Sequence, residues 1–276
     1  MLVNLNDVLK NAVKQKYAVG LFNTTDTDML QSAITAAEKL RSPIIIGTAE
    51  VLLPYGELSL LAPTIIKAAR DATVPVVVHF DHGTSFERCI EALKLGFSSV
   101  MFDGSALPYE DNLKATQEMV KIAHAFGASV EGEIGHVGQA DSAVEEESYT
   151  TVAEAVDFYN KTGVDALAVA IGSAHGVYKH KPKLNIARLK EISNALPIPI
   201  VLHGGSGLSV QNFTDCIQNG VAKVNVFTDL CLAGEQAYAK GLQNNLGYLE
   251  TRNLKVQEIT KAIEQKIHIF GSENKA

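Results

Sequence analysis

Short apolar runs rich in β-branched residues recur eight times along this chain, and each is followed by a loop and a segment with helical periodicity. Successive runs start 23 to 37 residues apart, the length of a strand, a helix and two connections. The runs are YAVGLF from Tyr17, PIIIG from Pro43, PVVVHF from Pro75, SVMF from Ser99, SVEGEIG from Ser129, ALAVAIG from Ala166, PIVLH from Pro199 and AKVNVF from Ala222.

Eight such units within 276 residues predict a single domain over residues 1–276, a (β/α)8 TIM barrel of parallel strands. A doubly wound open sheet is the alternative. It is weaker, because the first strand turn, LFNTTD, lacks the glycine-rich dinucleotide fingerprint. Residues 229–268 are helical in pattern and longer than a barrel needs, so we expect extra C-terminal helices outside the barrel or against another subunit.

The amino-acid composition limits which binding partners and which cellular compartment are expected for this chain. The net charge of −7 argues against a nucleic-acid partner, because no block of Lys and Arg is long enough to neutralise a run of phosphates. The three cysteines are widely spaced and form no C-x-x-C motif, which fits a reducing compartment. Neither a signal peptide nor a membrane-spanning run is present, so we expect a cytoplasmic protein with no membrane partner.

Polar side chains gather at the predicted carboxyl ends of six successive strands, the end of a TIM barrel where function collects. His82, His175 and His203 follow three different strands. An imidazole triad is a common ligand set for a catalytic Zn²⁺, with open positions for a substrate oxygen. Each histidine alone more often serves a structural hydrogen bond, but together they predict a zinc site.

Carboxylates accompany these histidines. Asp81 precedes His82, and an acid beside a metal-bound substrate serves as a general acid or base. Glu133 and Asp103 are candidates for supporting the metal ligands or for holding an accessory cation. His79 shares strand parity with Asp81 and lies further from the rim, so we expect it to support the ligands rather than to bind the metal.

Two glycine-rich or hydroxyl-bearing loops complete the predicted rim. HGGSG follows the seventh run and offers backbone N–H groups free of bulky side chains, while NVFT follows the eighth. The loops after strands seven and eight of such barrels often bind phosphate. The sequence therefore predicts a phosphate site beside the metal site.

Taken in order, the motifs HFDHGTS, FDGS, VEGEIG, AVAIGSAHGVY, VLHGGSG and KVNVFTDL resemble those of the class II, metal-dependent ketose-bisphosphate aldolases. The resemblance covers essentially the whole chain. It implies cleavage of a tagatose or fructose 1,6-bisphosphate to dihydroxyacetone phosphate and glyceraldehyde 3-phosphate. It also implies one catalytic Zn²⁺ on the three histidines, a possible monovalent cation near the phosphate, and a homodimer or homotetramer.

The same resemblance implies roles for individual residues. Asp81 would transfer the proton. The residues that would contact dihydroxyacetone phosphate are Gly176, Gly204, Gly205, Ser206, Asn225 and Thr228. Asn23, in the first strand, and Arg252, in the C-terminal helices, are possible further substrate contacts, Arg252 at the distal phosphate.

Two departures from the family pattern bear on the substrate. Where bisphosphate-cleaving relatives continue after strand five with a Gly-Gly-x-Glu-Asp loop, this chain reads GHVGQADSAVEEES. Glu145, Glu146 or Glu147 would replace the loop acid, or all three lie on a solvated loop. If Arg252 does not hold a distal phosphate, the substrate is a ketose 1-phosphate and the released aldehyde is unphosphorylated.

Two other classes compete with the aldolase interpretation. A metal-dependent hydrolase on the same barrel typically carries His-x-His on its first strand, which has no histidine here. A non-catalytic subunit that binds a sugar phosphate and supports a partner usually arises by loss of metal ligands. All three histidines and Asp81 are retained in this chain.

Overall fold

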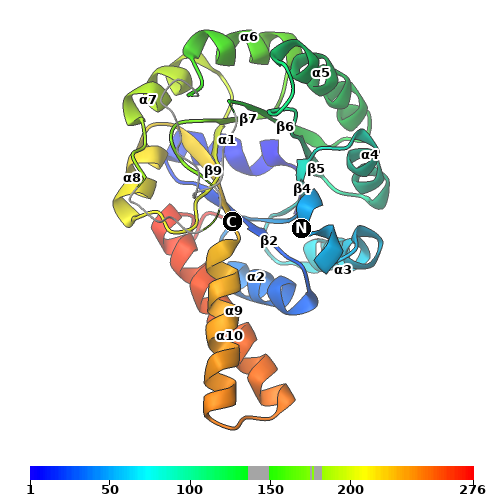
Figure 1. Cartoon of the computed structure of the whole chain (residues 1–276), viewed down its shortest axis with the longest axis vertical. Helices are drawn as coiled ribbons and strands as arrows, with labels where there is room; N and C mark the ends of the chain where they lie inside the picture. The colour runs from blue at the N-terminus through cyan, green and yellow to red at the C-terminus, as the bar shows by residue number, and fades with distance from the viewer. Residues whose placement is uncertain (136–148, 175, 177–181) are drawn as a thin grey trace.

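The computed structural model describes residues 1–135, 149–174, 176 and 182–276. Within them, parallel strands pair in the order β1-β4-β3-β2-β9-β8-β7-β6-β5, and β5 pairs back to β4. This last pairing closes the sheet into an eight-strand barrel, which helices surround in Figure 1. The predicted (β/α)8 barrel is confirmed, and the open doubly wound sheet is wrong.

The barrel strands coincide with the eight apolar runs of the sequence. They are β2 (Val19–Asn23), β3 (Ile44–Ala49), β4 (Val76–Gly83), β5 (Ser99–Phe102), β6 (Ser129–Ile134), β7 (Ala166–Val169), β8 (Ile200–Leu202) and β9 (Val221–Val226). A short additional strand, β1 (Leu2–Val3), pairs with the start of β4 and lies outside the predicted runs.

The helices alternate with these strands. They are α1 (Leu5–Gln15), α2 (Thr27–Lys39), the 3₁₀ helix η1 (Glu50–Tyr55), α3 (Leu58–Asp71), α4 (Phe86–Leu95), α5 (Tyr109–Ala125), α6 (Val152–Thr162), α7 (Ile186–Ala195), α8 (Val210–Gln218), α9 (Thr228–Gln243) and α10 (Tyr248–Phe270). None of those in the described part of the chain is both long and apolar enough to cross a membrane.

Both faces of the barrel strands are buried, and their side chains alternate between two environments. Along β4, Val78 and Phe80 point outward and pack with the surrounding helices. Val77, His79 and Asp81 have the opposite parity and point inward. Helix α1 packs with Val77 and other inward apolar side chains, closing the amino-terminal end of the barrel. The interior is therefore apolar near α1 and polar near the carboxyl ends of the strands.

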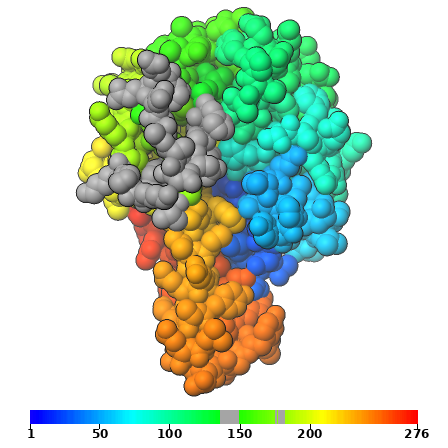
Figure 2. Space-filling model, in the orientation of Figure 1, coloured from blue at the N-terminus to red at the C-terminus, as the bar shows by residue number. Residues whose placement is uncertain are grey.

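The two C-terminal helices form an arm that extends beyond the barrel (Figures 1 and 2). Helix α10 packs along α9 and along α2, which anchors the base of the arm to the barrel wall. The predicted extra C-terminal helices are confirmed. At the arm's tip, the connection from α9 to α10 leaves Leu242 79% and Tyr248 83% exposed.

Candidate active site

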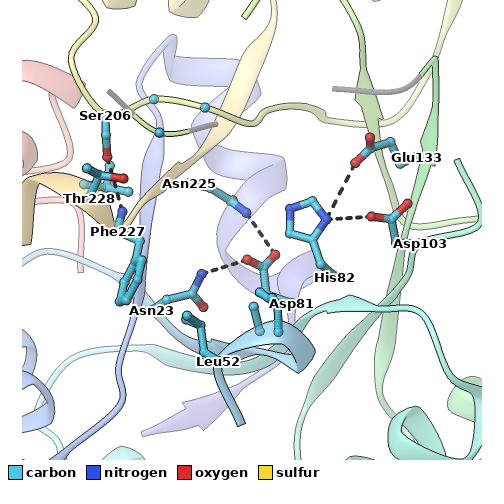
Figure 3. Close-up of a pocket in the computed structure, with 16 residues that line it drawn as sticks. Asn23, Leu52, Asp81, His82, Asp103, Glu133, Ser206, Asn225, Phe227 and Thr228 are labelled. Atoms are coloured by element: carbon cyan, nitrogen blue, oxygen red, sulfur yellow. Dashed lines mark hydrogen bonds and ion pairs between the residues drawn. The ribbon is translucent and has the colours of Figure 1, made fainter. Parts of the chain in front are cut away.

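A pocket of about 430 Å³ opens at the carboxyl ends of the strands. Figure 3 shows its polar side chains converging from different strands. The lining includes Asn23, Asp81, His82, Asp103, Glu133, Gly176, Gly204, Gly205, Ser206, Asn225 and Thr228, and its apolar wall includes Ala49, Val51 and Leu52. Predicted polar residues from the ends of several strands, among them Asp81, Asp103, Glu133 and Asn225, therefore meet in one cavity.

His82 reaches the pocket through an irregularity in β4. Regular alternation would send His82 to the opposite side of the strand from Asp81. The register against β5 shifts between Phe80 and Gly83, and His82 has a φ of +44°. Such a conformation is uncommon for a residue with a side chain and is often found at functional sites. The bulge brings the His82 imidazole onto the same side as Asp81.

The imidazoles of His82 and His203 face each other. His203 Nδ1 lies 2.8 Å from His82 Nε2. The far nitrogen of each ring contacts a carboxylate: His82 Nδ1 lies 2.7 Å from Asp103 Oδ2, and His203 Nε2 lies 2.8 Å from Glu131 Oε1. Because an ionised carboxylate only accepts, these far nitrogens carry the hydrogens. If both imidazoles were neutral, two lone pairs would face each other, so this arrangement needs a proton or a cation between the two nitrogens.

The surrounding charge favours a cation at this point. Burial alone would lower the pKa of His82, but the carboxylates of Asp81, Asp103 and Glu133 outweigh it and raise that pKa to about 9. Potential ligand atoms of Asp81, His82 and His203 all lie within 4.8 Å of one another, as do those of His82, Asp103 and Glu133. Carboxylate-supported imidazoles suit a zinc-type metal. His175, the third predicted ligand, lies outside the described residues, as do Glu145, Glu146 and Glu147.

Asp81 is held by two side-chain amides. Asn23 Nδ2 donates to Asp81 Oδ2 at 2.8 Å, and Asn225 Nδ2 donates to Asp81 Oδ1 at 2.9 Å (Figure 3). Burial alone would raise the pKa of Asp81, but the neighbouring charges of His82 and Lys223 hold it well below its usual range. The carboxylate is thus ionised, fixed in orientation and beside the facing imidazoles.

His79 lies deeper in the barrel than Asp81. Its Nδ1 is 2.7 Å from Ser99 Oγ, and its Nε2 is 3.8 Å from both Asp81 Oδ1 and Glu131 Oε2. Burial and the nearby Lys223 cation lower the pKa of His79 to about 3, so its imidazole is neutral. The structure therefore places His79 deeper in the barrel than Asp81, and His79 is not among the described residues grouped as potential metal ligands.

The glycine loop and the start of α9 form the side of the pocket near Ser206 and Thr228. Ser206 Oγ accepts from the N–H groups of Phe227 and Asp229, which ties the loop to the first turn of α9. Gly204 has a φ of +68°, and a Cβ there would lie 2.2 Å from the carbonyl oxygen of Ala174. A helix N-terminus beside a loop without bulky side chains is a suitable anion site.

Arg252 lies elsewhere. It is on α10, where its Nη2 is 2.7 Å from Asp28 Oδ1 of α2, and it does not line the pocket of its own chain. The described lining contains no lysine or arginine.

Sequence reasoning missed a charged pair below the pocket. Lys223 and Glu131 are fully buried, and Lys223 Nζ lies 2.8 Å from Glu131 Oε2. Burial would raise the pKa of Glu131, but Lys223 and the His203 hydrogen bond lower it to about 2. The available signal was parity: Lys223 is two residues before Asn225 on one strand, and so it faces the same interior.

Comparison with known proteins identifies the family. The model of the class II fructose-bisphosphate aldolases matches residues 3–275. The chain belongs to this family. This class II aldolase is 38% identical to a fructose-bisphosphate aldolase of Geobacillus stearothermophilus, over 100% of this chain and 99% of the relative. It is also 38% identical to a sulfofructosephosphate aldolase of Alkalicoccus urumqiensis, over 98% and 96%.

A solved structure supports the same relationship. The crystal structure of the YdjI aldolase from Escherichia coli K12 matches with a TM-score of 0.93 and 34% identity, and the match covers 100% of both chains. The chain is therefore an aldolase, a carbon–carbon lyase, and relatives of similar identity carry different substrate names.

Proposed function

We propose that this aldolase cleaves a ketose that carries a phosphate on C1, releasing dihydroxyacetone phosphate and an aldehyde. The observation that carries the proposal is the placement of ionised Asp81 beside the facing imidazoles of His82 and His203, next to the first turn of α9. One end of the pocket suits an anion, and its centre suits a metal and a proton acceptor.

We infer that Zn²⁺ is the metal, held by His82, His203 and His175. When bound, it supplies a Lewis acid that polarises the ketose carbonyl and stabilises the negative charge of the enediolate. Asp103 and Glu131 orient the two described imidazoles through their far nitrogens. Glu133 Oε2, 3.5 Å from His203 Nδ1, adds negative charge to the same site.

Asp81 carries the proton step. Its carboxylate takes the proton of the C4 hydroxyl as the C3–C4 bond breaks, and the C4 oxygen becomes the aldehyde carbonyl. The electron pair of the broken bond stays on the three-carbon fragment as its enediolate. One proton is then added at C3 to give dihydroxyacetone phosphate, and it is balanced by the proton that Asp81 releases to return to its carboxylate. Asn23 and Asn225 keep Asp81 in one orientation throughout.

We place the C1 phosphate against Gly204, Ser206 and the first turn of α9, with Gly176 and Thr228 at its edges. Backbone N–H groups and the helix dipole supply the positive potential there, since the described lining has no lysine or arginine. A monovalent cation in this region would add to it. Gly205 supports the loop rather than the ligand, because its N–H donates to the carbonyl oxygen of Asn225.

For the aldehyde half, our first candidate is a 1,6-bisphosphate of the tagatose or fructose type, consistent with relatives named fructose-bisphosphate aldolase. A second candidate is a ketose 1-phosphate that gives an unphosphorylated aldehyde. The pairing of Arg252 with Asp28, away from the pocket, favours it. So does the apolar wall of Val51 and Leu52.

One assay tests the reaction and its substrate. The purified chain, with and without chelator and with zinc restored, is incubated with ketose 1-phosphates and ketose 1,6-bisphosphates, and dihydroxyacetone phosphate is measured. We expect release that a chelator abolishes and zinc restores. A higher kcat/KM for the 1,6-bisphosphates would favour the first candidate. A higher kcat/KM for the 1-phosphates would favour the second. No release from any substrate would overturn the proposal.

We also propose that the chain forms a homodimer or homotetramer and that the arm is part of the contact. The arm presents Leu242, Tyr248 and Leu249 to solvent at its tip, each more than two-thirds exposed. Clustered exposed apolar side chains of this kind are typical of interaction surfaces.

A further inference from the structure

Lys223 is a cation in the middle of the barrel with no solvent contact. Its ammonium group lies between two partners: Glu131 Oε2 at 2.8 Å and Asn225 Oδ1 at 2.7 Å. A buried ion pair is weak evidence for stability, because the desolvation of both charges offsets their attraction. Stability alone therefore does not explain why Lys223 is present, and its second contact, with Asn225, indicates another role.

The contact with Asn225 fixes which end of that amide faces Asp81. An ammonium group only donates, so it binds the oxygen of Asn225 and leaves the N–H₂ group to face Asp81. Turned by 180°, the amide would present its oxygen to an ionised carboxylate, which only accepts. Lys223 thus excludes the orientation in which Asn225 would repel Asp81.

Asn23 provides a contrast on the other carboxylate oxygen. Its Nδ2 also donates to Asp81, but its Oδ1 has no hydrogen-bond partner among the described residues. Of the two amides that hold Asp81, the one from β9 is therefore the one locked by a cation.

Lys223 itself is out of reach of a substrate. It is fully buried and is absent from the pocket lining, so it neither transfers a proton to a ligand nor forms a covalent bond with one. Its effect on the reaction passes through the Asn225 amide, through its own charge, which helps to keep Asp81 ionised, or, by way of Glu131, through His203, whose Nε2 contacts Glu131 Oε1.

We propose that Lys223 is a positioning residue for the aldolase reaction: it orients the Asn225 amide and through it holds Asp81 for proton transfer from the C4 hydroxyl. This inference rests on the proposed function. Lys223 would act through its hydrogen bond to Asn225 Oδ1, without touching the substrate.

The test uses paired substitutions that remove both buried charges at once. Lys223→Met with Glu131→Gln leaves no unpaired buried ion, and the Gln carbonyl still accepts from His203. Lys223→Gln with Glu131→Gln is the matched variant, since its amide retains an N–H donor for Asn225. Lys255→Met removes an α10 lysine that pairs with Asp26, the N-cap of α2, and controls for loss of an ion pair outside the pocket lining.

For the Met pair we expect kcat to fall at least tenfold, while KM and the zinc dissociation constant stay within threefold of the parent. The Gln pair should have a kcat at least threefold higher than that of the Met pair. Lys255→Met should have the kcat of the parent. Combined with Asp81→Asn, the Met pair should change the residual kcat less than twofold, because its effect passes through Asp81.

The opposite results overturn the proposal. These are an unchanged kcat, a loss that follows zinc affinity, an equal loss in the Asp81→Asn background, or equal losses for the Met and Gln pairs. If the Met pair does not fold, a Gln pair that folds as the parent but loses more than tenfold in kcat also overturns it. A parent protein with no aldolase activity would instead overturn the proposed function.

Discussion

Asp81 is the residue on which the proposed chemistry depends most directly. Replacement by Asn keeps its shape but removes the proton acceptor, and general-base contributions are about 10²- to 10⁴-fold. We expect kcat for ketose cleavage to fall in that range with the zinc content unchanged, measured by dihydroxyacetone phosphate release and by metal analysis. A variant that keeps both its zinc and full activity would contradict the assignment.

Asp103 acts one step further from the substrate. It accepts from His82 Nδ1 at 2.7 Å, and the loss of such a partner typically weakens metal binding by about 10- to 100-fold. We expect Asp103→Ala to weaken zinc binding by that factor, measured by competition with a chromogenic chelator. Asp111→Ala, an exposed acid on α5, is the control and should bind zinc as the parent does.

At the scale of the element, the glycine loop after β8 allows a matched comparison. Gly204 and Gly127 both have positive φ, but a Cβ at Gly204 meets the carbonyl of Ala174, whereas one at Gly127 meets nothing within 4 Å. Gly127→Ala should cost only the left-handed backbone penalty, about 1–2 kcal/mol. Gly204→Ala should cost more in urea unfolding and should raise KM for a C1-phosphorylated ketose. Equal costs would show that the loop can move aside.

Helix α2 illustrates how pH enters stability. Asp26 caps the helix by accepting from the N–H groups of Asp28 and Met29, and its Oδ2 lies 2.7 Å from Lys255 Nζ. Burial would raise the pKa of Asp26, but the Lys255 hydrogen bond and the backbone donors outweigh it and lower that pKa. Its stabilising effect is therefore complete above the unfolded-state pKa and is lost as the pH falls through the folded-state value.

Asp26→Ala should therefore reduce the free energy of unfolding by about 1 kcal/mol at pH 7, the usual effect of losing a cap. The difference from the parent should shrink in acid, where the parent carboxylate is protonated. Asp26→Asn is the control, because Asn also caps helices well. Urea unfolding at pH 7 and at a pH below the ordinary aspartate pKa of 3.8 measures both differences, and a difference that grows in acid would contradict this account.

The strands were predictable from sequence and their interior pairings were not. A buried parallel strand appears as a β-branched run, so SVMF gave β5 with the bounds that the structure has, Ser99–Phe102. The ion pair of Lys223 and Glu131 joins β9 and β6, which are not neighbours in the sheet. Finding it requires the register of the closed barrel, which a single strand does not reveal. β1 was missed because two residues carry no periodicity.

His82 shows the same limit within the site. Its position after a strand marked it as a candidate ligand, but alternation with Asp81 predicts that the two side chains diverge. The bulge in β4 and the φ of +44° at His82 reconcile them. Sequence placed the polar residues at the correct end of the barrel, while local backbone irregularity decided which of them meet.

For the whole molecule, we predict that copies of the chain associate through the tip of the arm. If copies of the chain associate through its tip, Leu242→Glu with Leu249→Glu should shift the mass measured by light scattering from an oligomer to a monomer. The matched change Leu60→Glu, at an exposed leucine of α3, tests whether any apolar surface has this effect. An oligomer unaffected by the arm-tip substitutions would place the contact elsewhere.

Helix α9 joins two places with different tasks. It begins at Thr228, on the pocket lining, and ends at Gln243, near the tip of the arm. At 1.5 Å per residue it is a stiff rod of roughly 24 Å. A subunit contact at the arm tip and the proposed C1-phosphate site would therefore lie at opposite ends of one continuous helix.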